Sequence, residues 1–338
     1  MKIHEIIREG GWDTVATQNT VITPSLVKAG ISAMERFVAG FNKFLGSKGI
    51  GLVSIGTPTG SSAYHNVDPE ETEYGDIDLQ IIVPELPELE GKTHAQVQTF
   101  WHNLAGEFVA AHPNVAHEES KPGHPVLPVG NDKFVQVDMM IHTQPMAKWG
   151  AARTIPERGV KGMLHGNMFS VFGEMLTMSI QHSGVQFKVR DQVRQPYSTT
   201  RKNYELVTIS TDPETFVLDT FMHEASSLGI RNPKIAPLLK QFPGKDLANV
   251  KISNLANAIK GFAQSCEMNK MFGHGDLSAF SSANDFIQDF IQRYEAKAVK
   301  DVESNKRDKA ATPAAVARAD MDKKKILGGL EMVKGLFQ

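Results

Sequence analysis

The 338-residue chain has almost no cysteine, and this scarcity narrows its chemistry. Cys266 stands alone in the sequence, so an internal disulfide is excluded and a reducing, cytoplasmic setting is expected. It falls in the helix-patterned stretch 255–271, which favours a buried, inert thiol over a nucleophile. The chain also lacks an apolar run of 18 residues, so no membrane span is expected. Its opening residues are too charged for a secretory signal.

Several common cofactor and metal motifs are missing as well. No Gly-Lys-Ser/Thr follows a glycine-rich loop, which excludes ATPase chemistry of the P-loop type. There is no Gly-x-Gly-x-x-Gly after a strand, no Cys-x-x-Cys and no His-Glu-x-x-His. The 12 histidines show no metal-ligand spacing. A net charge of −2 gives no general attraction to nucleic acid or to anionic membranes.

Positive charge is absent from one long stretch of the chain. Residues 51–91 contain nine acidic residues and neither lysine nor arginine. Because like charges repel, this stretch is expected to need cations close by. Residues 293–325, in contrast, carry ten basic and six acidic residues, which is more typical of a solvated helix face than of a phosphate-binding surface.

Three carboxylates on two short apolar runs are the most informative feature that is present. Asp76 and Asp78 open one run, and Asp138 stands in another, two residues after Gln136. Side chains on a strand alternate between its two faces, so Asp76 and Asp78 share one face. Gln136 and Asp138 share a face for the same reason. If the two strands are neighbours, the three carboxylates converge.

Three carboxylates close together destabilise the folded state unless their charge is neutralised. Two like charges about 4 Å apart repel by roughly 4 kcal/mol at an effective dielectric near 20. A fold tolerates this cost if protons or metal ions neutralise the charge. Hard carboxylate oxygens suit Mg²⁺ or Mn²⁺. The pattern therefore predicts a metal-dependent site at Asp76, Asp78 and Asp138.

A loop of small residues precedes the first acid pair. Gly60 lets the backbone approach a phosphate closely, and the N–H and hydroxyl groups of Ser61 and Ser62 can donate to phosphate oxygens. We interpret Gly60 and Ser61 as phosphate ligands. Ser62 has two interpretations, since it either joins them or completes the turn.

The order of expected elements indicates an α/β (α+β) fold. Residues 1–150 are expected to form a small mixed-sheet core, 151–303 a mostly helical domain, and 304–338 a linker with a C-terminal helix. Helices are expected at 25–45, 93–111, 162–182, 211–227, 250–272 and 282–303. Strands are expected at 51–56, 76–83, 126–129, 134–141, 185–189 and 204–209.

Taken together, these motifs resemble the DNA polymerase β-type nucleotidyltransferase superfamily. A Gly-Ser loop, an Asp-x-Asp strand about 15 residues later and a lone Asp on a later strand carry the resemblance. The matching stretches are 55–62, 74–83 and 134–141, within roughly residues 25–142. The second half is similar to the helical domains of poly(A) polymerases, tRNA-end-adding enzymes and oligoadenylate or cyclic-dinucleotide synthases. The first residues resemble those of phage-encoded proteins. The segment between the loop and the acid pair departs from the pattern, being long and acidic.

The resemblance implies transfer of a nucleoside monophosphate from an NTP such as ATP. Asp76 and Asp78 would hold two Mg²⁺ (or Mn²⁺) ions. Asp138 would share one of these ions and help to activate the attacking hydroxyl. Gly60 and Ser61 would bind the β- and γ-phosphates.

An RNA 3′ end is the expected acceptor. Phosphate contacts would come from basic residues of the second domain, Lys161, Lys188, Arg190, Arg194, Arg201 and Lys202. Two other classes stay open. One is an enzyme that joins nucleotides to each other, to a protein or to a small molecule. The other is an inactive relative that binds nucleotide or has a structural role.

Overall fold

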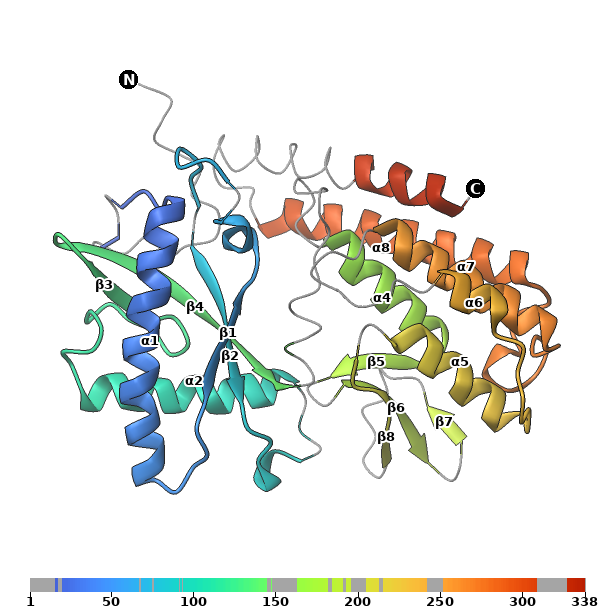
Figure 1. Cartoon of the computed structure of the whole chain (residues 1–338), viewed down its shortest axis with the longest axis horizontal. Helices are drawn as coiled ribbons and strands as arrows, with labels where there is room; N and C mark the ends of the chain where they lie inside the picture. The colour runs from blue at the N-terminus through green and yellow to red at the C-terminus, as the bar shows by residue number, and fades with distance from the viewer. Residues whose placement is uncertain are drawn as a thin grey trace. The chain divides into compact units, whose positions relative to one another are not determined.

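The computed structural model divides the chain into two compact units, residues 1–151 and 152–338. Figure 1 labels their helices and strands. The structure describes residues 16–17, 20–66, 68–74, 76–90, 92, 94–144, 147, 163–181, 184–190, 193–195, 205–212, 215–241, 252–308 and 327–337. Across these ranges, no helix has both the length and the apolar content needed to span a bilayer.

The first unit is built on a mixed sheet of four strands. They are β1 (Ser54–Pro58), β2 (Ile77–Val83), β3 (Val126–Gly130) and β4 (Lys133–Thr143), in the spatial order β1-β2-β4-β3. The central strands β2 and β4 are parallel, and each edge strand is antiparallel to its neighbour. The helices of this unit are α1 (Pro24–Ser47), α2 (His94–Ala111) and the short 3₁₀ helices η2 (Ser61–Tyr64) and η3 (Pro87–Leu89).

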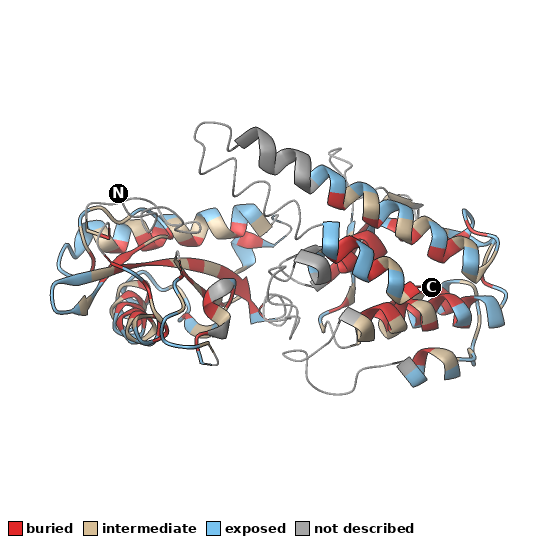
Figure 2. Ribbon diagram, turned by 90° about the horizontal axis from the view of Figure 1, so that it is seen from above, coloured by how far each residue is buried: buried red, intermediate tan, exposed pale blue. Residues whose placement is uncertain are grey.

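One face of this sheet is apolar because the strand sequences alternate. Ile77 and Leu79 of β2 are buried in a single core with apolar side chains of β4, α1 and α2. Helix α1 contacts all four strands, and a Cβ at Gly30 would overlap the Ile77 side chain. The Phe108 ring of α2 packs edge-on against Phe37 of α1. Most residues of the central strands β2 and β4 are buried, and Figure 2 shows the buried colour along the middle of this unit's sheet.

The opposite face of the central strands is polar. Asp78 and Gln80 of β2 lie on it, beside Gln136 and Asp138 of β4. Gln80 is buried, and its Nε2 donates to the carbonyl oxygen of Ala147 at 2.8 Å. Polar side chains are therefore organised along this face, with the carboxylates near the start of β2.

The second unit combines helices with a small antiparallel sheet. Strand β6 (Gly184–Arg190) pairs along one edge with β8 (Glu205–Ser210), and along the other with β5 (Met178–Gln181) and then β7 (Val193–Gln195). The helices are α4 (Met163–Met175), α5 (Phe216–Ser227), α6 (Ala236–Gln241), α7 (Ile252–Met268), the 3₁₀ turn η6 (Gly275–Leu277) and α8 (Ala283–Asp308). Residues 327–337 are also helical.

Aromatic side chains fill the core of the second unit. The Phe172 ring of α4 packs edge-on against Phe216, Phe262 and Phe286, which come from α5, α7 and α8. Cys266 of α7 is fully buried, as expected, and this burial raises the pKa of its thiol. A buried, protonated thiol is a poor nucleophile, so Cys266 belongs to the core.

The predicted α/β (α+β) class is confirmed, with a mixed sheet in the first unit and helices dominating the second. Helices expected at 25–45 and 93–111 correspond to α1 and α2, and the strand expected at 76–83 is β2. The hairpin expected from 126 to 141 is formed by β3 and β4.

Several boundaries differ from the sequence-based expectation, and helix α6 was not expected. The strand expected at 51–56 is shifted to β1, because its antiparallel pairing with β2 sets its ends. The helix expected over 162–182 ends at Met175, where Thr177 adopts a positive φ of 57° and the chain enters β5. Strand β7 was not expected. Residues 304–308 belong to α8 and not to a linker, and residues 309–326 lie outside the described part.

Candidate metal centre

The structure brings the three predicted carboxylates together on the polar face of the first sheet. Asp78 and Asp138 are direct partners in the parallel ladder between β2 and β4, and Asp76 lies one residue before β2. One oxygen from each carboxylate lies within 4.8 Å of the others, and all three residues are half-buried. We call these three residues the acid cluster. Its hard oxygen donors and partial exposure fit a divalent cation such as Mg²⁺ or Mn²⁺.

Gly60 lies directly against the acid cluster. Its φ of 57° falls in the left-handed region that favours glycine, and a Cβ at this position would overlap the Asp78 carboxylate. The loop is fixed to β2 because the Thr59 N–H donates to the Asp78 carbonyl oxygen at 2.8 Å. A glycine is required here for two independent reasons, and the result is backbone in close approach to the Asp78 carboxylate.

Ser62 is a correction to the sequence-based interpretation that made it a phosphate ligand. It is fully buried, and its hydroxyl donates to the Thr59 carbonyl oxygen at 2.9 Å. Its own carbonyl oxygen accepts a hydrogen bond from His65 Nδ1 at 2.8 Å. Ser62 therefore completes the turn, which was the second interpretation. The side chain of Ser61 lies outside what the structure describes, so its phosphate contact stays a prediction.

Asp138 has two partners that sequence reasoning missed. His124 Nδ1 donates to Asp138 Oδ1 at 2.8 Å, and Gln136 Nε2 donates to the same oxygen at 2.6 Å. Strand alternation had placed Gln136 on the correct face without indicating this bond. No signal in the sequence marked His124, which stands in the loop between α2 and β3 and is 14 residues away from its partner.

The environment of His124 favours its charged form. The hydrogen bond to Asp138 raises the pKa of His124 above its usual value, while burial opposes this effect. Behind it, burial lowers the pKa of His102, whose ring centroid is 6.0 Å from that of His124. A protonated His124 places positive charge beside the acid cluster, in a region whose sequence offers little of it.

Arg194 is neither of the two things the sequence offered for it, a candidate phosphate contact or a surface charge. Its guanidinium pairs with Glu224 at 2.9 Å and with Asp276 at 3.0 Å, and it lies 4.0 Å from the centroid of the Phe187 ring. Only 8% of the Arg194 side chain is exposed. We call Arg194, Glu224 and Asp276 the arginine cluster. Its arginine is committed to the core of the second unit and is not available to a nucleic acid.

The other basic residues expected at the site divide into two groups. Lys188 is buried in β6 and Arg190 is half-buried at the end of that strand, so neither presents a fully exposed cation. Lys161, Arg201 and Lys202 lie outside the described residues.

Comparisons with known proteins were made with family models, curated sequences and solved structures, and none of the three finds a match for this chain. The chemistry of the acid cluster therefore carries the functional argument by itself.

Proposed function

We propose that the chain is a metal-dependent nucleotidyltransferase that moves a nucleoside monophosphate from an NTP to an acceptor hydroxyl. The observation that supports this most is the acid cluster, where three carboxylates from two adjacent parallel strands bring oxygens within 4.8 Å of one another. The close approach of Gly60 to Asp78 adds a glycine loop at the same place. An acid cluster next to a glycine loop suits a triphosphate that arrives with its cations.

Each residue has a role in this proposal. Asp76, Asp78 and Asp138 would hold the divalent cations, and Gly60 and Ser61 would face the β- and γ-phosphates. Bound divalent cations would supply Lewis-acid stabilisation of the oxygens that attack and leave. The carboxylates place this charge before the reaction begins, so positioning and electrostatics account for most of the expected rate enhancement.

The reaction balances without a further co-reactant. The acceptor oxygen forms a bond to the α-phosphorus while the bond between that phosphorus and the bridging oxygen breaks. Pyrophosphate leaves, and the hydroxyl proton passes to Asp138 or to water beside it. Asp138 is assigned this task in the proposal, and the hydrogen bonds from His124 and Gln136 to its Oδ1 would hold its carboxylate in one orientation.

Pyrophosphate release from each NTP, with Mg²⁺ or Mn²⁺ and total RNA, tests the proposal. Asp78→Asn should lower the rate by several orders of magnitude, because it removes a cation ligand while keeping the size of the side chain. Asp132→Asn is the matched control. Asp132 is exposed in the β3–β4 turn at a φ of 54°, which asparagine also adopts, and should keep full activity. Undiminished turnover in Asp78→Asn would sink the assignment.

The destination of the labelled nucleotide identifies the acceptor. The proposal names an RNA 3′ end, and label in RNA supports it. Label in a small soluble product formed without RNA identifies a nucleotide-joining synthase, and label on polypeptide identifies a protein acceptor. Nucleotide binding with no transfer would mean an inactive, nucleotide-binding protein.

A further inference from the structure

We propose that His124 and Gln136 are positioning residues that orient Asp138 toward the cation. This inference rests on the proposed function, because it concerns how one of the metal-binding carboxylates is held. Both hydrogen bonds described for the Asp138 side chain go to Oδ1, from His124 Nδ1 and Gln136 Nε2. Two donors on one oxygen restrict the orientation of the carboxylate, and in this proposal Oδ2 is the atom that meets a cation shared with Asp76 and Asp78.

Backbone pairing places His124 directly beside Asp138. The ladder between β3 and β4 pairs Val126 with Gln136. It continues beyond β3, because the Val137 N–H donates to Pro125 O at 3.0 Å and the Met139 N–H donates to Gly123 O at 2.8 Å.

His124 and Asp138 stand between these two hydrogen-bonded pairs. Their backbone groups do not bond to each other, so they form a non-hydrogen-bonded pair of the ladder. Facing side chains come closest at such a pair, which allows the side-chain hydrogen bond between His124 and Asp138. Asp138 therefore has Asp78 as its neighbour across one edge of β4 and His124 across the other.

Gly123 and His102 keep this extension in place. Gly123 has a φ of 78°, and a Cβ there would lie 2.6 Å from the His102 ring, so a larger residue would displace the loop. His102 in turn donates from Nε2 to the carbonyl oxygen of Met139 at 2.9 Å. Helix α2, the loop and β4 thus meet at the residue that follows Asp138.

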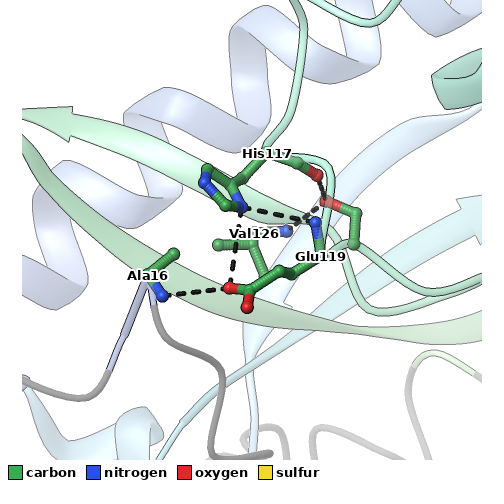
Figure 3. A network of polar contacts seen from close by, with 5 residues as sticks. Ala16, His117, Glu119 and Val126 are labelled. Atoms are coloured by element: carbon green, nitrogen blue, oxygen red, sulfur yellow. Dashed lines mark hydrogen bonds and ion pairs between the residues drawn. The ribbon is translucent and has the colours of Figure 1, made fainter.

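The rest of the loop is anchored from its other side, as Figure 3 shows. Glu119 Oε2 accepts the Ala16 N–H at 2.9 Å and lies 3.7 Å from His117 Nδ1. The Ser120 hydroxyl donates to the His117 carbonyl oxygen and accepts the Val126 N–H at 2.9 Å. The Ser120 contacts close the loop on itself just before His124, and Glu119 ties the loop to Ala16.

Mn²⁺ binding to the full-length protein without nucleotide tests the inference, with electron paramagnetic resonance reporting the free ion. His124→Ala should weaken Mn²⁺ binding about tenfold, the effect typical of removing a group that orients a metal ligand. His124→Asn should restore most of the affinity, because the asparagine amide nitrogen can occupy the place of Nδ1. His124→Gln puts its amide one bond farther out and should not restore it.

Two further measurements separate positioning from folding. His112→Ala is the control, since His112 is exposed at the end of α2 and its ring nitrogen bonds to Phe108 O. It should bind Mn²⁺ as the wild type does. Gln136→Ala should weaken binding less than His124→Ala. If the alanine variant of His124 does not fold, the contrast between His124→Asn and His124→Gln decides the question.

The outcomes for the inference and for the proposed function are distinct. Equal Mn²⁺ affinity in wild type, His124→Asn and His124→Gln would overturn the positioning role. Wild-type protein that binds Mn²⁺ but transfers no nucleotide would overturn the proposed function, while graded affinities in the variants would still support positioning. Wild-type protein that binds no Mn²⁺ in the absence of nucleotide would overturn the positioning role, whereas the proposed function is decided by pyrophosphate release from NTP.

Discussion

The two units treat their charged clusters in opposite ways. In the first, the acid cluster gathers charges of one sign on a half-exposed sheet face. In the second, the arginine cluster sets one guanidinium between two carboxylates in the core, at 2.9 and 3.0 Å. The arginine cluster is satisfied by the chain itself. In the proposed function, the charge of the acid cluster is neutralised by divalent cations that bind to it.

This contrast separates structural charge from functional charge. A buried ion pair stabilises only if every member keeps its partner, so removing one partner lowers the free energy of unfolding. A cluster of like charges opposes folding when no cation is bound, so removing one of its carboxylates should lower cation binding and activity and not stability. Two clusters in one chain allow both effects to be measured against each other.

The largest expected effect on stability comes from breaking the arginine cluster. Arg194→Met should lower the free energy of unfolding by about 3–5 kcal/mol, because it leaves Glu224 buried without its cation. Burial already raises the pKa of Glu224, and Arg194 opposes that rise. Urea unfolding at pH 7 measures the loss. In EDTA, Asp78→Asn should leave stability unchanged or raise it.

An exposed ion pair gives the control for this comparison. Lys48 and Glu107 are also 2.9 Å apart, but both side chains are well exposed. Lys48→Met should cost less than about 1 kcal/mol. The double variant Arg194→Met/Glu224→Gln should recover part of the loss. An Arg194→Met protein as stable as Lys48→Met would show that burial does not distinguish the two pairs.

His142 differs from both clusters, because its burial favours the neutral form of the side chain. His142 of β4 is 6% exposed, stacks on His94 at 5.6 Å, and has no hydrogen-bond partner for Nδ1 within the described ranges. Burial, and then the neighbouring His94, lower the pKa of His142 to about 4. The folded state thus resists protonation more than the unfolded state does.

The sign of the pH effect follows from this difference. Stability from His142 is fully present above its usual pKa of about 6.5 and is lost as pH falls toward 4, by about 3 kcal/mol in all. His142→Phe keeps the ring and removes the titration, so its stability should fall less between pH 7 and 4.5. Urea midpoints at the two pH values measure the difference. Identical pH dependence in variant and wild type would contradict the assignment.

Binding of a divalent cation to the acid cluster should offset the repulsion among its three carboxylates. Mn²⁺ at about 100 times its dissociation constant should raise the free energy of unfolding by about 2.7 kcal/mol. Mg²⁺ and NTP together should shift the melting temperature by more than the sum of their separate shifts, because each offsets the charge of the other. Asp76→Asn/Asp78→Asn should show neither effect. Additive shifts in the wild type would argue against a shared site.

Strand periodicity, with the assumption that two strands are neighbours, predicted the acid cluster. A period of two is a local property of the chain, so it placed Asp76 and Asp78 on one face and Asp138 on the matching face of a second strand. That the two strands are neighbours was an assumption, and the ladder between β2 and β4 confirms it and shows that they are parallel. The resemblance to a known superfamily rested on the same residues.

Contacts that depend on tertiary packing could not be predicted in this way. His124 reaches Asp138 through an extension of the β3–β4 ladder that requires Gly123 to fit against His102. The buried state of Arg194 depends on carboxylates from α5 and η6, 30 and 82 residues farther along the chain. A basic residue in a polar stretch gives no sign of such partners. Local pattern therefore found the three carboxylates of the acid cluster and missed the residues that contact them.

The adjacent residues Ser61 and Ser62 allow the same comparison between a proposed functional side chain and a structural one, with the smallest expected effects. Ser62→Ala removes a buried hydroxyl bonded to Thr59 O and should lower the free energy of unfolding by about 1 kcal/mol. Ser61→Ala should spare folding and weaken NTP binding by about 1 kcal/mol or somewhat more, because a lost donor to a charged phosphate costs more than one to a neutral group. Urea unfolding and titration with a fluorescent NTP analogue measure the two quantities for each variant. A Ser61→Ala protein that binds NTP normally but unfolds more easily would make Ser61 structural as well. The glycine at position 60 would then be left as the only loop residue assigned to the triphosphate.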